Sequence, residues 1–352
     1  PLYVPEDCKT LKEAVKRVAH DSRITTIVLG EGKHVVEVLK DERGHDHNTL
    51  VISSAMRIVG RPDVPKEKIV VVGGIGFKKG IQGNCHLQHM TLCQAKGSGV
   101  VARSSFTMED VIVEQCSGYG VFAECSAGVG RCTNLEVRQC GSSGVRAASG
   151  GSITLIGAKT TVHHNCTKGT GYIYGLKVSY GSSATIQLVS PLTKEIVSTD
   201  NGGGGNWGAN AYADINQIKT KTKAEFTAVL EQEARVEAAS QKMKVTGTVN
   251  VPEDCDVNEA VKAVDLANAR KYFTGGRSAT ILLGKGEYQI NGDYLKVFSA
   301  MSIVGRPDVP KEMIVVVGGI EFKRGIEGNC HLQHMTLRQS KGNGVWGESS
   351  FT

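Results

Sequence analysis

A few charged side chains recur at regular spacing in the middle of the chain, and they are the residues most able to do chemistry. Glu114, Arg138 and His164 occupy matching places in successive short repeats, and Glu136 lies two residues before Arg138. An acid, a guanidinium and an imidazole stacked on one face are able to bind a sugar acid or to take a proton from it. The alternative is a solvated ladder of ion pairs, which contributes little to stability.

The acids that a polysaccharide hydrolase needs are scarce in this region. Most such enzymes place two carboxyl groups on either side of the bond that they cleave. Residues 85–190 contain few acids and no aspartate pair at one level of the repeat. A glycine run at 202–205 precedes Trp207, whose ring is a candidate for stacking on a sugar or for plugging the end of the fold.

Metal ligands are present but poorly grouped. Cys85, His86 and His89 are close in sequence, yet no cysteine pair has the spacing of a zinc site. His89, Asp110 and Asn134 fall at the same place in the short repeat, which is typical of a ladder of polar turn residues. The sequence therefore predicts neither a metal nor a cofactor.

The short repeat predicts the fold. Segments of alternating apolar and polar residues are followed by an amide and a glycine turn, and the amide advances by 21, 24 and 26 residues. Three short strands per repeat correspond to one coil of a right-handed parallel β-helix, an all-β solenoid with coils stacked about 4.8 Å apart. The leucine consensus of a leucine-rich repeat is missing.

Stacked coils place equivalent residues in ladders along the axis. We expect an inward amide ladder, which identical side chains form when strands stack in register. We also expect a ladder of buried, reduced thiols, and glycines that supply positive φ beside it. The amides are Gln94, Gln115, Gln139 and Asn165; the thiols are Cys116, Cys140 and Cys166; the glycines are Gly99, Gly120, Gly144 and Gly175.

The chain also contains a long internal repeat. Segments near its start recur 245–247 residues later, which signals tandem modules. Residues 224–236 lack glycine and proline and predict a helix at the junction. We expect a first β-helix unit at 1–220, a helical linker or cap at 221–247 and the start of a second unit at 248–352. The repeated segments are 4–8 with 251–255, 61–67 with 306–312, and 83–90 with 328–335.

Composition excludes some partners. The formal net charge is +6, without a basic block, so nucleic-acid binding is not expected. No apolar run is long enough to span a membrane. The segment starts without a methionine and stops inside a repeat, so we expect a longer parent chain, and the compartment stays open.

The openings of both long repeats resemble pectin lyase-like β-helix proteins, with a capping helix followed by strands that end in glycine turns. The whole unit is similar to tandem β-helix repeat proteins of marine unicellular algae. The resemblance implies a right-handed parallel β-helix but not one activity, because this superfamily includes lyases, hydrolases, epimerases, adhesins and inert shafts. The segments that carry it are 10–15, 26–32 and 56–60, and 259–261, 280–288 and 301–305.

Two classes of function follow from these patterns. The first is a non-catalytic structural or binding module, repeated in tandem as a rigid rod, whose partners are polysaccharides or other copies of itself. The second is a polysaccharide-active enzyme, a lyase or an epimerase. Near-identical coils without an acid pair favour the first.

Overall fold

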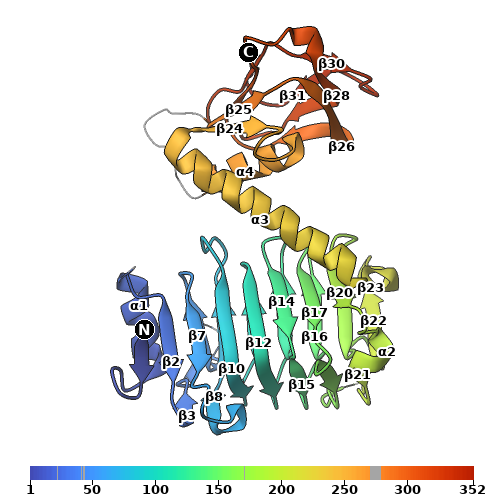
Figure 1. Cartoon of the computed structure of the whole chain (residues 1–352). Coiled ribbons are helices and arrows are strands. Elements are labelled where there is room, and N and C mark those ends of the chain that lie inside the picture. Colours follow the sequence, from blue (N-terminus) through green and yellow to red (C-terminus); the bar gives the residue numbers. More distant parts are fainter. Residues whose placement is uncertain (22, 41, 43, 170, 270–278) are drawn as a thin grey trace. The chain divides into compact units, whose positions relative to one another are not determined.

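The computed structural model describes the chain except residues 22, 41, 43, 170 and 270–278. It separates into two compact units, Pro1–Lys223 and Ala224–Thr352, each built around its own hydrophobic core. The first unit is a right-handed parallel β-helix in which the chain passes once per coil through three parallel sheets (Figure 1). The fold class predicted from the short repeat is therefore confirmed.

Two sheets of the first unit share their central strands. β10 and β12 are each nine residues long and bend at a single residue, so each belongs to both sheets. The first sheet consists of β1 (Leu2–Val4), β2 (Thr26–Leu29), β7 (Arg57–Gly60), β10 (Cys85–Cys93), β12 (Phe106–Glu114), β14 (Val129–Thr133), β17 (Ser152–Ile156), β20 (Thr185–Val189) and β23 (Ile218–Lys221). The second adds β3 (Gly32–Val35), β8 (Ile69–Val72), β15 (Glu136–Arg138), β18 (Thr161–His163) and β21 (Ser198–Thr199).

The third sheet is separate and contains one strand from each of seven coils. Its inward side chains are aliphatic and fully buried, as Val100, Val121, Val145 and Leu176 show, because alternate residues of a strand point to opposite faces. Its strands are β6 (Thr49–Ile52), β9 (Gly74–Phe77), β11 (Val100–Ala102), β13 (Val121–Glu124), β16 (Val145–Ala148), β19 (Leu176–Ser179) and β22 (Trp207–Asn210). A short antiparallel hairpin joins β4 (Leu39–Lys40) to β5 (Asp46–His47).

Each coil turns at single residues with left-handed backbone. At the corner between the first and second sheets, His89, Asp110 and Asn134 have φ of 55°, 52° and 51°. Among residues other than glycine, asparagine, aspartate and histidine adopt positive φ most often. The predicted ladder of polar turn residues at this corner is therefore present.

The predicted inward amide ladder is wrong for its three glutamines. Gln94, Gln115 and Gln139 form the next corner, with φ of 54–55°, and their side chains are exposed. A left-handed residue breaks the strand alternation, so the glutamine turns outward and the residue after it points into the core. The Gln115 amide nitrogen still donates to Gln139 Oε1 at 3.2 Å, but it does so at the surface.

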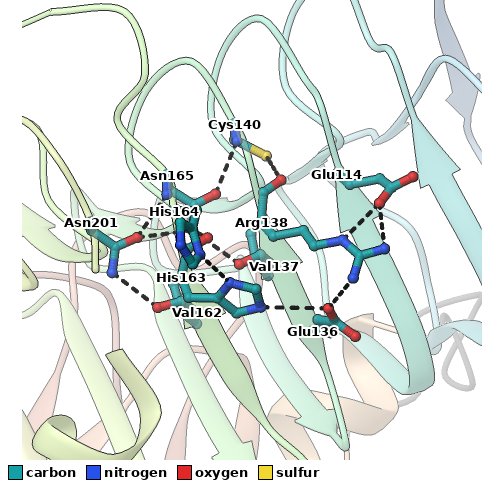
Figure 2. A network of polar contacts seen from close by, with 10 residues as sticks. All are labelled: Glu114, Glu136, Val137, Arg138, Cys140, Val162, His163, His164, Asn165 and Asn201. Carbon is teal, nitrogen blue, oxygen red and sulfur yellow. Dashed lines mark hydrogen bonds and ion pairs between the residues drawn. The ribbon is translucent and has the colours of Figure 1, made fainter. Parts of the chain in front are cut away.

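An inward amide pair, the buried Asn165 and the half-buried Asn201, lies one place beyond the corner on two later coils (Figure 2). The inward row after the corner contains Cys116, Cys140, Asn165 and Asn201. Asn165 Oδ1 accepts from the Cys140 amide at 3.1 Å, and its Nδ2 donates to the Val137 carbonyl at 2.9 Å. Asn201 repeats this pattern on the next coil and accepts from Asn165 Nδ2 at 3.0 Å.

Two further expectations for this turn need correction. Cys166 is buried, but it lies one residue beyond the row of Cys116 and Cys140, where Asn165 stands instead. The glycines at 99, 120, 144 and 175 do not have positive φ. They are required by close packing, since a Cβ on Gly120 would lie 2.2 Å from Val137 Cγ1 of the next coil.

The cysteines are free thiols, and in the first unit all except the half-buried Cys125 are buried. Burial raises the pKa of Cys132 to about 12 and that of Cys166 to about 11. Because the thiolate is the reactive form, we expect a thiol reagent to label Cys125 quickly and the buried thiols only as the protein unfolds. Mass spectrometry of labelled peptides measures each site, and Cys125→Ser should remove the fast phase. Fast labelling of Cys132, or a disulfide between Cys116 and Cys140, would contradict the stacked-thiol arrangement.

One helix covers the first coil, and the shorter helices connect strands. α1 (Leu11–His20) covers the first coil of the first unit and buries Leu11 and Val15. α2 (Lys194–Val197) and the 3-10 turns Lys66–Lys68 and Ile215–Gln217 connect strands. No helix in the described part of the chain is long and apolar enough to cross a membrane.

The second unit rebuilds the opening of the first. The helix predicted at 224–236 is present and longer, as α3 (Lys223–Thr246), and it packs Met243 into the core of this unit. Its Arg235 binds the buried carboxylate of Glu259 on α4 (Val257–Ala269) at 2.8 Å. The sheets contain β24 (Thr248–Val251), β25 (Ala279–Leu283), β27 (Met301–Gly305) and β29 (His331–Gln333), and β26 (Gly286–Val297), β28 (Ile314–Phe322), β30 (Thr336–Arg338) and β31 (Val345–Gly347), with a 3-10 turn at Lys311–Met313.

Candidate functional site

The charged candidates form a row of outward side chains on the second sheet (Figure 2). Strand register places Glu114 beside Arg138, and Arg138 beside His163. The Arg138 guanidinium lies 2.8 Å from Glu114 Oε2 and 2.6 Å from Glu136 Oε1. His163 Nε2 lies 3.5 Å from the same oxygen of Glu136.

His164 is not part of this row, which corrects the sequence assignment. It occupies the left-handed corner with φ of 55°, its side chain is exposed, and the residue before it takes the outward strand position. The rings of His163 and His164 meet at their Nδ1 atoms, 2.7 Å apart. The row therefore consists of Glu114, Arg138 and His163, with Glu136 beside them.

The charges of this row compensate each other. Arg138 is held between the carboxylates of Glu114 and Glu136, so its charge is balanced within the row. Partly exposed pairs of this kind add little to stability. The row resembles a structural ion-pair ladder more than a catalytic centre.

The histidines near Cys85 do not converge on a metal. Cys85 points into the core, whereas His86 points outward and bonds Thr107 Oγ1 at 2.7 Å. His89 uses both ring nitrogens, one toward Asp110 Oδ2 at 2.7 Å and one toward the Val64 carbonyl at 2.8 Å. Within the described residues, no group of three or more histidines, cysteines or acids is placed to hold a metal ion.

Trp207 is the first residue of β22, and its side chain points inward. It pairs in register with the buried Leu176 and packs against the core of the first unit. Lys194 Nζ lies 5.4 Å from the centre of its ring. This placement is that of a hydrophobic plug in the last coil, the alternative that the sequence left open beside sugar stacking.

The outer face of the third sheet carries a cluster that the sequence analysis missed. Arg146 on β16 and Lys177 on β19 are direct neighbours in register, and both point away from the core. Arg146 is nevertheless 8% exposed and Lys177 6% exposed. Like charges on adjacent strands repel each other, so this arrangement costs stability unless another group compensates it.

Aromatic side chains cover Arg146. The Arg146 guanidinium lies 4.6 Å from the ring centre of Tyr119, 4.7 Å from that of Phe122 and 5.4 Å from that of Tyr180. It also donates to Ser179 Oγ at 3.1 Å and to the Tyr119 hydroxyl. Rings attract cations through their negative faces, which explains how Arg146 is held without an acid.

Lys177 is less well compensated. Its ammonium donates to the carbonyl of Tyr172, and in the described part of the chain neither it nor Arg146 forms an ion pair with a carboxylate. Burial, followed by the charge of Arg146, lowers the pKa of Lys177 to about 8, while Cys166 nearby acts in the opposite direction. Tyr180, whose ring lies 5.4 Å from Arg146, is 58% exposed, and Tyr172, whose carbonyl binds Lys177, is 71% exposed.

A signal for this cluster was present in the sequence. The second residue after the turn glycine of successive coils is Val101, Phe122, Arg146 and Lys177. Comparing this outward column across the coils would have placed two cations side by side.

Comparisons with known proteins give little further information. No family model matches the chain, and no curated protein matches it. Among solved structures, the catalytic domain of a GH87 α-1,3-glucanase in complex with tetrasaccharides is similar at 11% identity and a TM-score of 0.33, covering 100% of this chain and 67% of that one. A likeness at this level carries no argument about activity.

Proposed function

We propose that the chain is a non-catalytic binding module of a tandem β-helix protein of the pectin lyase-like kind. Its first unit binds an acidic polysaccharide on the outer face of the third sheet. The observation that carries this proposal is the pair of buried, adjacent cations, Arg146 and Lys177, that lack a carboxylate partner among the described residues. A carboxylate or sulfate of the polymer would supply the missing negative charge.

The surroundings of the pair fit a polysaccharide better than a small anion. Tyr180 exposes an amphipathic ring beside Arg146, and such rings contact the apolar face of a sugar while leaving their hydroxyls in water. The strands beneath are rigid, because each is paired on both sides within the stacked coils. A preformed face of this kind binds with a small loss of conformational entropy.

A second candidate function is elimination or epimerisation on the same polymer. It is favoured by the lowered pKa of Lys177, about 8, which leaves part of the lysine neutral near neutral pH and able to accept a proton. Glu124 of β13, two strands from Lys177, is bound to Arg103 at 2.7 Å. An assay for new double bonds or inverted sugars separates this activity from binding alone.

Lys177→Met tests the proposal because it removes the charge while preserving an unbranched side chain. We expect affinity for an oligouronate or a sulfated oligosaccharide to fall about tenfold or more, as expected when a charge-assisted hydrogen bond is lost. For the unaltered protein, binding should be strong below pH 8 and weaken as the pH rises through 8, because Lys177 then loses its proton. Titration calorimetry measures both effects.

Lys159→Met is the matched control, since it removes an exposed lysine from another part of the same unit. It should bind like the unaltered protein, and both variants should show the unaltered circular dichroism. Binding that is unchanged in Lys177→Met, or absent for every acidic oligosaccharide, would refute the proposal.

A further inference from the structure

The second unit has a groove where the first unit has an additional hairpin. In the first unit, residues 36–48 connect β3 to β6, and Glu37 of this connection binds Lys12 on α1 at 2.6 Å. In the second unit, the matching connection is shortened to residues 290–293 within β26. A groove of about 530 Å³ lies here between α4, β26 and β28, and its wall includes Asn258, the counterpart of Lys12.

Several residues in the wall of this groove differ from their counterparts in the first unit, whereas the core beneath them does not. The inward residues Leu295 and Val297 are aliphatic and buried in both units. The coils therefore pack without the changes on the outer side. Val51 is 49% exposed although further coils follow it in the first unit, so this position faces solvent in its own right. The changed residues are Tyr294, Lys296 and Phe298, which replace Thr49, Val51 and Ser53, and Asp265, which replaces Ala19.

The groove contains two ammonium groups without an acidic partner. Among the described residues, neither Lys262 nor Lys296 forms an ion pair with a carboxylate, and residues 270–278 contain no acid. Two other acids in the wall are already paired, Glu321 with Lys323 and Asp293 with Lys341 at 2.8 Å. The two lysines therefore remain opposite one acid, Asp265, and the groove favours a ligand with a negative charge.

Asp265 adds a buried acceptor to the groove. It lies on α4, and its Oδ1 is buried without a hydrogen-bond partner in the described part of the chain. Burial raises the pKa of Asp265 to about 6, while a hydrogen bond with Ser299 acts in the opposite direction. An unpaired buried oxygen is costly, and a hydroxyl group of a ligand would satisfy it.

We infer that this groove is a second site for acidic sugars, which binds one ring that carries a carboxylate or sulfate group. Lys262 and Lys296 bind the charged group, and Asp265 accepts a hydrogen bond from a ring hydroxyl. The volume of about 530 Å³ is typical of small-molecule sites, and the half-exposed Phe298 adds an aromatic ring to the wall. This inference rests on the proposed function, from which it takes the class of polymer, and it gives each unit one such site.

Lys296→Met tests the inference, because it removes one ammonium group and preserves an unbranched side chain. We expect a trisaccharide of a uronic acid, or a sulfated trisaccharide, to bind the full chain at two sites. One site should weaken about tenfold or more in Lys296→Met, as when a charge-assisted hydrogen bond is lost. The other should stay within about twofold in this variant and should weaken in Lys177→Met instead. Titration calorimetry gives the number of sites and both affinities.

Lys285→Met is the matched control, since it removes an exposed lysine of the second unit that does not line the groove. It should leave both sites unchanged, and all variants should keep the unaltered circular dichroism. The uncharged methyl ester of the uronic acid trisaccharide should bind at neither site.

The outcomes separate this inference from the proposed function. A single site that only Lys177→Met weakens would overturn the inference and leave the proposed function standing. A single site that only Lys296→Met weakens would refute the proposed function and support the groove. Equal binding of the uncharged methyl ester, or absence of binding for both acidic trisaccharides, would overturn both.

Discussion

Replacing Asn165 with alanine should destabilise the first unit by about 4 kcal/mol, near the upper end for a single substitution. The side chain is 2% exposed, and its amide satisfies the Cys140 amide and the Val137 carbonyl of the preceding coil. Alanine leaves these buried groups without partners, and each such group costs about 1–3 kcal/mol. It also removes the contact that joins Asn165 to Asn201. Urea unfolding followed by circular dichroism measures the change.

Gln139→Ala is the control for that experiment. Gln139 carries the same functional group one coil earlier, but at the exposed corner position. Its replacement should alter stability by no more than about 0.5 kcal/mol, as is usual at exposed sites. Equal costs for the two variants would mean that inward and outward positions have been confused at this turn.

The corner residue and the inward residue after it differ by one place in sequence, and this difference explains what the sequence could and could not predict. The alternation of Leu135 and Val137 with Glu136 and Arg138 is local, and such patterns predict strands, coils and their parallel stacking. The corner conformation is not visible in such a pattern. Aligning Asn165 with the glutamines by residue type displaced His164 and Cys166 by one place. Aligning the buried Val162 with Val137 gives the correct register.

The cation cluster was missed for a different reason. Arg146 and Lys177 are 31 positions apart in sequence, and basic residues at outward positions normally indicate solvated surface. The groups that contact them, the rings of Tyr119 and Tyr180 and the carbonyl of Tyr172, lie in turns before and after the strands. Those turns vary in length between coils, so their paths do not follow from the strand period.

The turn glycines at 99, 120, 144 and 175 are required for space and not, as the sequence predicted, for a left-handed backbone. Gly120 has no positive φ, so its backbone accepts alanine. An added Cβ would nevertheless lie 2.2 Å from Val137 Cγ1 and 2.6 Å from the Gly144 carbonyl oxygen. Val137 is fully buried, and that carbonyl accepts from the Val121 amide at 2.9 Å, so neither can retreat freely. Gly120→Ala should therefore cost about 3 kcal/mol through overpacking.

Two comparisons isolate this steric cause. Gly97→Ala changes a glycine of the preceding turn that has nothing within 4 Å of its added Cβ, and it should be neutral or slightly stabilising. Gly120→Ala combined with Val137→Ala should cost less than the sum of the two single changes, because the smaller side chain makes room for the new methyl group. Chemical unfolding of the unaltered protein, Gly120→Ala, Val137→Ala and the double variant gives the coupling energy. A strictly additive pair would show that Gly120 is required for a reason other than contact with Val137.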